Sequence, residues 1–291
     1  MARFSHFLGV DWSGAKGERH KGIALALVGK EGAPVLLERQ RGWSRDDVLA
    51  FLRDDLPEDT LVGLDLGIAL PFADCEAYFP GVPTSPPTAK DLWAMIDDVC
   101  RAEPHLGAQP FVEHPTFLPY FRNGAATGRQ FRCDGAEHGR GRFRVTEHAQ
   151  AAMGAKPYSN LNLVGAAQVG KSSLTGMRML HRLGGCLPVW PIDPLPASGP
   201  AVVEIYTSLA AIAAGRRAGA AKMRDYTALN EGLTTLGSPA VAGRGTIDDH
   251  SSDALLTAAW LRQVAYDPRL WSPNRLTPAI AATEGWTFGA L

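Results

Sequence analysis

The sequence has few cysteines and contains no long uninterrupted apolar segment. Its four cysteines, Cys75, Cys100, Cys133 and Cys186, lie far apart among 291 residues. That spacing excludes the paired pattern of a zinc knuckle and the density of a secreted disulfide scaffold, so we expect reduced thiols that pack in the interior. No segment is apolar for long enough to span a bilayer, and no secretory leader is recognisable. These absences predict a cytoplasmic protein with no membrane partner.

The sequence also lacks an excess of charge of either sign. Lys and Arg number 29 against 30 Asp and Glu, which gives a formal net charge of -1. No global basic field therefore attracts nucleic acid, and any site for a polyanion must be a local patch. The apolar fraction of 45% is enough to bury one large core or two modest ones.

The order of the predicted elements indicates an α/β fold. Apolar runs bounded by Gly-rich turns predict three strands at the start of the chain, then a helix that Ser44 caps, then a buried strand ending at Asp65. The strands fall at residues 4–12, 22–28, 34–40 and 61–65. Three strands, a helix and a fourth strand are the opening of an RNase H-like mixed sheet flanked by helices.

The remaining chain predicts one domain with a large insertion. Residues 71–199 are rich in Pro, Gly and aromatic side chains, which interrupt regular structure. A β-branched strand follows at 201–206, and the last predicted helix of the core begins near Asp248 and has an apolar stripe. We therefore predict a single domain of residues 1–291, with the core in 1–70 and 200–266, the insertion in 71–199, between the fourth and fifth core strands, and a C-terminal extension in 267–291.

Carboxylates interrupt or end the predicted core strands. Asp11 and Asp65 each stand at the end of a buried strand, and Glu204 lies within the strand at 201–206. A buried carboxylate needs a hydrogen bond, an ion pair or a metal ion, and two of them on neighbouring strands favour a metal. The alternatives are that each Asp caps a turn and that Glu204 faces water on an edge strand.

The start of the last predicted helix supplies further candidate ligands. Helical spacing places Asp249, His250 and Asp253 near one face, whereas Asp248 is better explained as the helix cap. We therefore predict a catalytic set of Asp11, Asp65, Glu204 and Asp253, and a metal-binding set of Asp11, Asp65, Asp249, His250 and Asp253. Oxygen donors without cysteine favour Mg²⁺ or Mn²⁺, and a pair of such ions can hydrolyse a phosphodiester.

Several motifs together resemble a known family. They are Gly-Val-Asp-Trp-Ser-Gly at 9–14, the strand ending in Asp65 with Pro71 beyond it, Val-Val-Glu-Ile-Tyr at 202–206 and His-Ser-Ser-Asp-Ala-Leu at 250–255. They resemble a domain-of-unknown-function family described as predicted RNase H-like nucleases. The last motif also resembles the final helix of Holliday-junction resolvases, in which the matching residues bind metal. The resemblance implies a metal-dependent nuclease.

This chain departs from that family at two places. The family usually shows Asp-x-Pro-Leu-Gly where this sequence has Asp65-Leu-Gly-Ile, and Glu-x-Tyr-Pro where it has Glu204-Ile-Tyr-Thr. We therefore expect the loops beside both carboxylates to differ from those of the family. A protein that keeps the fold without catalysis remains an alternative.

A second motif favours a different function. Residues 165–172 match the Walker A pattern letter for letter, which would make this chain a nucleotide hydrolase or kinase with Lys171 on the phosphates. A P-loop follows a buried strand, but the preceding residues 158–164 are half polar. A sugar-kinase or actin-like ATPase is a further alternative, although we find no second Gly-rich half in the sequence.

Basic and aromatic residues alternate between Phe117 and His148, a pattern that suits single-stranded nucleic acid; the alternative is a solvated loop. We expect the substrate to contact Ser13, Lys171, Arg140 and Arg142. The sequence thus predicts a hydrolase that cleaves phosphodiester bonds of nucleic acid with Mg²⁺ or Mn²⁺.

Overall fold

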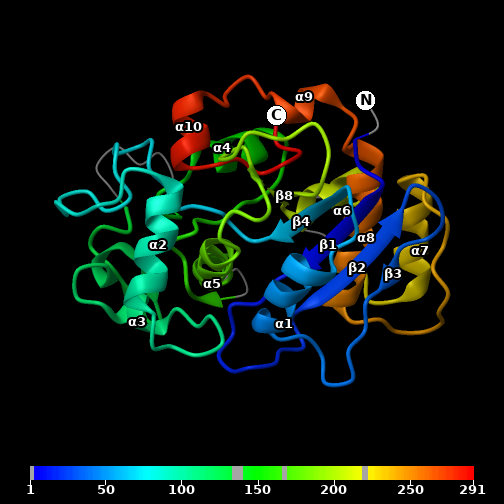
Figure 1. The fold of residues 1–291 in the computed structure, drawn as a ribbon, viewed down its shortest axis with the longest axis horizontal. Helices are drawn as coiled ribbons and strands as arrows, with labels where there is room; N and C mark the ends of the chain where they lie inside the picture. The colour runs from blue at the N-terminus through cyan, green and yellow to red at the C-terminus, as the bar shows by residue number, and fades with distance from the viewer. Residues whose placement is uncertain (1–2, 133–139, 166–168, 218–221) are drawn as a thin grey trace.

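A six-stranded mixed sheet forms the centre of the protein in a computed structural model (Figure 1), which describes residues 3–132, 140–165, 169–217 and 222–291. The strand order is β3-β2-β1-β4-β8-β7. β2 is antiparallel to β1 and β3, whereas β1, β4, β8 and β7 run parallel to one another. The strands are β1 (His6–Asp11), β2 (Ala24–Gly29), β3 (Val35–Leu36), β4 (Thr60–Asp65), β7 (Val189–Trp190) and β8 (Ala201–Glu204).

Helices cover both faces of this sheet. α8 packs on β1 and β2 with α6 and α7 beside it, and α1, α2 and α5 pack together on the other side. In the described parts of the chain the helices are α1 (Arg45–Ala50), α2 (Ala89–Val99), α3 (Gln109–Glu113), α4 (Val145–Ala152), α5 (Val169–Arg182), α6 (Thr207–Ala213), α7 (Tyr226–Thr235), α8 (Asp249–Val264), α9 (Pro268–Trp271) and α10 (Pro278–Thr283), with a π-helical turn at Phe51–Asp55 and a 3₁₀ turn at Leu118–Tyr120.

Successive side chains of the central strands point to opposite faces of the sheet, and this produces two separate hydrophobic cores. Leu8 and Val62 belong to the core under α1, α2 and α5, whereas Phe7 and Leu61 belong to the core under α8. Successive side chains of a strand point to opposite faces, so each central strand contributes apolar groups to both cores. This explains why the predicted strands are apolar at nearly every position.

The predicted α/β class and the insertion between β4 and β8 are confirmed. Ser44 caps α1 as predicted, in a capping box with Asp47. The strand predicted at 34–40 is much shorter, because only Val35–Leu36 pairs with β2. The insertion, mostly at the left of Figure 1, carries α2 to α5, a two-stranded hairpin of β5 (Arg122–Asn123) and β6 (Ala126–Thr127), and also β7. β7 therefore adds a sixth strand to the sheet from within the predicted insertion.

The C-terminal segment returns to the sheet. Thr287 forms a β-bridge with Glu204, and Trp286 and Phe288 are fully buried. The side chain of Glu284 accepts hydrogen bonds from the backbone N–H groups of Phe72 and Val145, both at 2.7 Å. The segment thereby joins β8 to the insertion. No helix among the described residues is long and apolar enough to cross a membrane.

α8 lies unusually close to β1 because Gly9 has no side chain. A Cβ atom built on Gly9 would lie 2.5 Å from the carbonyl oxygen of Ala254 and 2.9 Å from the backbone nitrogen of Ala258. Backbone atoms at that distance cannot move aside without moving the helix. Gly9 therefore sets the spacing that places the first turn of α8 over the carboxyl end of β1.

We predict that Gly9→Ala destabilises the protein by about 1–3 kcal/mol, because the added methyl group forces α8 away from β1. Urea unfolding followed by circular dichroism measures this. Gly29→Ala is the matched control at the end of β2, where the nearest atoms to an added Cβ lie 3.9 Å away. Equal stability of the two variants would show that the close helix contact does not constrain the fold.

Candidate functional site

Two carboxylates lie side by side at the carboxyl ends of the central parallel strands. Asp11 of β1 is the register partner of Asp65 of β4. They share a face with Gly9 and Gly63, two residues earlier in each strand, and that is the face on which α8 packs. Neighbouring strands lie about 4.8 Å apart, so the two side chains emerge close together toward the first turn of α8.

The first turn of α8 adds His250 and Asp253 to this pair. His250 Nδ1 lies 2.7 Å from Asp11 Oδ2, and this hydrogen bond raises the pKa of the imidazole. Asp253 is almost completely buried beside them. The structure thus brings Asp11, Asp65, His250 and Asp253 from distant parts of the chain to one end of the sheet.

The carboxylates share one ammonium group. Lys222, just before α7, contacts the Asp253 carboxylate through Nζ. Burial acts to lower the pKa of Lys222, but the negative charges of Asp253, Asp65 and Asp11 together raise it. Lys222 was not predicted from the sequence, since no local pattern distinguishes it from a solvated lysine.

The pKa of the Asp65 carboxyl is raised further than that of Asp253. Burial, and then repulsion by Asp11, raise the pKa of the Asp65 carboxyl to about 7. Thr207, at the start of α6, donates a hydrogen bond from Oγ1 to Asp65 Oδ2 at 3.0 Å. Burial likewise raises the pKa of Asp253 to about 6 despite Lys222. An additional cation would reduce the repulsion among these closely spaced carboxylates.

Thr207 is a second residue that the predicted site did not include. It stands where the resembled family has proline, and a proline there would supply no hydroxyl for Asp65. The sequence difference was visible, but its connection to Asp65 was not, because 142 positions separate the two residues.

Glu204 does not join the other predicted catalytic residues. It pairs in register with Leu64, so it faces the side of the sheet opposite to Asp65. Its two carboxylate oxygens accept hydrogen bonds from the Arg144 guanidinium at 2.5 and 2.8 Å, and Ile68 N–H donates to one of them at 2.8 Å. A cavity of about 30 Å³ reaches both Glu204 and Asp65. The prediction of Glu204 as a catalytic carboxylate is corrected: it is a buried ion-pair partner of Arg144.

Arg142 is also placed differently from the prediction. Its side chain is fully buried, donates to Asp74 at 2.6 and 2.9 Å and reaches the carbonyl of Tyr78 at 2.7 Å. A guanidinium enclosed in this way cannot meet a substrate phosphate, so its predicted substrate contact is corrected to a role in holding the insertion together. Arg140, in contrast, is exposed, with its guanidinium 5.4 Å from the centre of the Tyr158 ring.

The other predicted residues lie at the margins of the site. Asp249 forms an ion pair with Arg224 at 3.0 Å and is one-third exposed. The Ser13 side chain and the His250 ring both lie next to Gly22, because a Cβ on Gly22 would be 3.3 Å from each of them. Lys171 lies in the first turn of α5 and lines a neighbouring cavity.

The Walker A-like segment has no preceding strand in the described structure. Residues 166–168 lie outside the described part, and α5 begins at Val169. No strand is found among the described residues between β6 and β7. The strand from which a P-loop extends is therefore missing there, as residues 158–164 indicated.

The described residues contain no group of three or more His, Cys, Asp or Glu side chains already arranged to hold a metal ion. The donor chemistry nevertheless suits a hard divalent cation, since Asp11, Asp65 and Asp253 offer carboxylate oxygens and two of them have raised pKa values. The side chain of Lys222 stands where it would compete with such a cation.

No protein-family model matches the chain, and no similar curated protein or solved structure is found for it. The geometry of the site is thus the basis for its interpretation.

We predict that Asp65→Asn stabilises the metal-free protein at pH 8, and that this gain shrinks as the pH falls toward 4. The folded-state pKa of about 7 lies above the ordinary 3.8, so the folded protein binds more protons than the unfolded chain between these values and loses stability as the pH rises. The amide removes that charge and keeps an acceptor for Thr207. Urea unfolding in EDTA across this pH range measures the effect.

Asp98→Asn is the control for this prediction, because the Asp98 side chain is 65% exposed and lies on the surface of α2. It should show no comparable gain at pH 8. If the free energy of unfolding of both variants depended on pH as that of the wild type does, the raised pKa of Asp65 would be wrong.

Proposed function

We propose that this protein is an RNase H-like phosphodiester hydrolase that works with Mg²⁺ or Mn²⁺. The observation that carries the proposal is the register pairing of Asp11 with Asp65, together with Asp253 from α8, around a single ammonium group. The order β3-β2-β1-β4, with β2 antiparallel to its neighbours, is consistent with an RNase H-like sheet. Nucleic acid is the proposed substrate.

The proposed metal ligands are Asp11, Asp65 and Asp253. A divalent cation bound there would supply activation of water and stabilisation of the leaving oxygen. His250 orients the Asp11 carboxylate by its hydrogen bond, and Thr207 orients that of Asp65. Lys222 has to leave Asp253 for a cation to take its place, and its half-exposed side chain has solvent to move into.

A non-catalytic protein of the same fold is the second candidate, and one observation favours it. Lys222 already provides a positive charge among the carboxylates, so the ammonium could replace the metal permanently. The two candidates differ in whether a divalent cation displaces Lys222.

We predict that Mn²⁺ binds the wild-type protein and binds Lys222→Met at least about tenfold more tightly. The variant removes a positive charge that competes with the cation. At close range the repulsion between two unit charges exceeds the about 1.4 kcal/mol that corresponds to a tenfold change in affinity. Titration followed by electron paramagnetic resonance of free Mn²⁺ measures both affinities. Lys90→Met is the control, since Lys90 pairs with Asp193. Absence of Mn²⁺ binding in wild type and Lys222→Met would favour the non-catalytic candidate.

We predict that at least one member of a panel of single-stranded, duplex, hybrid and branched nucleic acids is cleaved in a Mg²⁺- or Mn²⁺-dependent way. Asp11→Asn should lower kcat by at least about a hundredfold with little change in substrate binding, because it removes a metal-positioning charge. Asp249→Asn should retain most of the rate, since Asp249 pairs with Arg224. An uncut panel, or full activity of Asp11→Asn, would rule out the nuclease.

A further inference from the structure

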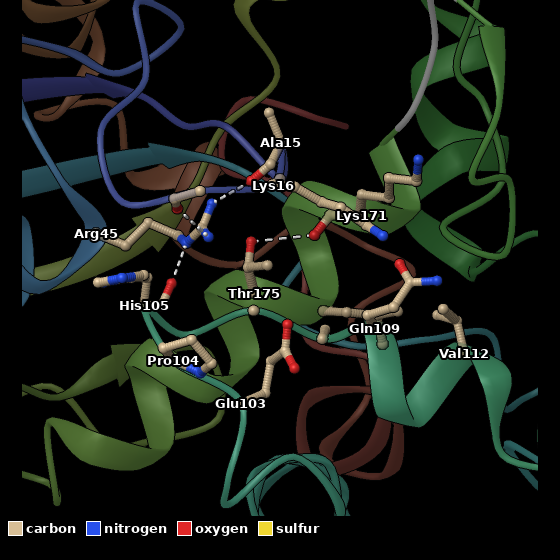
Figure 2. A pocket seen from close by; sticks show the side chains of 15 residues that line it. Ala15, Lys16, Arg45, Glu103, Pro104, His105, Gln109, Val112, Lys171 and Thr175 are labelled. Carbon is tan, nitrogen blue, oxygen red and sulfur yellow. Dashed lines mark hydrogen bonds between the residues drawn. The ribbon is translucent and has the colours of Figure 1, made fainter.

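A cavity of about 160 Å³ lies on the other side of the turn that follows Asp11. Its walls are the turn at residues 14–17, the first turns of α5 and the segment 103–112. Figure 2 shows Lys16 and Lys171 on one side of it, with Arg45 and His105 across from them. The cavity is therefore built from segments far apart in the sequence.

The cavity has an excess of positive charge. Lys16, Lys171 and Arg45 line it, against one carboxylate, that of Glu103. Lys16 is exposed and Lys171 is partly buried, and no ion pair involves either of them among the described residues. These two ammonium groups are thus available to an anion.

Arg45 is buried, and in the described parts of the chain it forms no ion pair, although the charge of the neighbouring Asp46 acts on it. It is 1% exposed, and it donates hydrogen bonds to the carbonyl oxygens of Ser13 at 3.0 Å, Ala15 at 2.9 Å and His105 at 2.7 Å. Burial lowers the pKa of its guanidinium to about 10. A cation enclosed by neutral acceptors favours a negative charge in the adjoining space.

A second buried guanidinium lies behind the cavity wall. Arg178 pairs with Asp97 at 2.8 Å and reaches the carbonyl oxygens of Glu103 and Gly107, which line the cavity. Its Nη2 has no hydrogen-bond partner among the described residues, and its charge disfavours that of Arg45. Asp97 compensates the charge of Arg178, so Arg178 adds to the site only its repulsion of Arg45 and an unsatisfied N–H group.

Part of the remaining lining is apolar, next to the polar side chains of His105, Gln109 and Thr175. Pro104, Val112 and Leu174 line the cavity together with several glycine and alanine residues. A cavity of about 150 Å³ accepts a molecule of the size of benzene, so this cavity encloses a single ring and the rest of a larger ligand has to lie outside it. A ligand that fits carries a flat ring inside the cavity and a negative charge near the exposed Lys16.

The turn between the cavity and the carboxylates belongs to both sites. The Ser13 carbonyl oxygen accepts a hydrogen bond from Arg45 on the cavity side, and the Ser13 side chain lies next to Gly22, which the His250 ring also approaches. Gly14 packs against the start of α5, because a Cβ there would lie 2.3 Å from the Lys171 carbonyl carbon. A ligand in the cavity is thus one short turn away from Asp11.

We propose that this cavity binds one nucleotide, with the phosphate on Lys16 and Lys171 and the base against Pro104, Val112 and Leu174. The choice of a nucleotide rests on the proposed phosphodiester hydrolase. The ligand is either a free mononucleotide or the phosphorylated terminal nucleotide of a strand that reaches Asp11.

Calorimetric binding of AMP in EDTA tests the proposal without any metal. We expect AMP to bind at least tenfold more tightly than adenosine or inorganic phosphate. The double variant Lys16→Met with Lys171→Met should weaken AMP binding at least tenfold, and Ala15→Glu, at an exposed lining position, should do the same by repulsion. Lys30→Met, in the turn after β2, is the control and should leave the affinity unchanged.

Competition identifies the source of the nucleotide. A 5′-phosphorylated oligonucleotide that displaces AMP supports a strand terminus, and AMP binding without displacement supports a free mononucleotide. No AMP binding, or equal affinity in wild type and in the double variant, would overturn the proposal. Because metal is absent, AMP binding by a protein that cuts no nucleic acid would keep this site and reject only the hydrolase.

Discussion

The contact between α8 and β1 at Gly9 is the constraint on which the candidate site depends. Backbone meets backbone there, so the helix has a fixed height above the strand. That height brings His250 within 2.7 Å of Asp11 and buries Asp253 near both strand-end carboxylates. A larger residue at position 9 would separate the acidic groups before it disturbed either of them directly. The close spacing of the charged groups in the site thus depends on the absence of a side chain at Gly9.

Buried arginines organise the parts of the chain around that contact. Arg144 links α4 to β8 through Glu204, Arg142 fastens the insertion through Asp74, and Arg45 holds the turn after β1 by carbonyl oxygens. Removal of one partner from such a pair leaves an uncompensated buried charge, which is strongly disfavoured. Charged residues that would suit a ligand in an exposed loop are used here to fix distant segments to one another.

The sequence predicted those features that depend on local pattern. Strand ends at Asp11 and Asp65, the cap at Ser44 and the helix after Asp248 follow from periodicity and turn residues. The face of Glu204 was not predictable, because it depends on register with β4, and a shift of one residue reverses the face. Arg142 was assigned to the substrate and Lys222 was not singled out for a similar reason: their partners Asp74 and Asp253 are 68 and 31 positions away from them.

The positions of the covering elements along the sequence have a consequence for how the chain acquires its structure during synthesis. β1 pairs with β2 and β4 within the first 65 residues, whereas α8, which packs on β1, begins only at Asp249, and Thr287 forms the bridge with Glu204. Glu284 completes hydrogen bonds that begin at Phe72 and Val145. A chain synthesised only as far as α7 therefore leaves uncovered the apolar face of β1 and β2 on which α8 packs. We expect such incomplete chains to need protection from aggregation until α8 has been made.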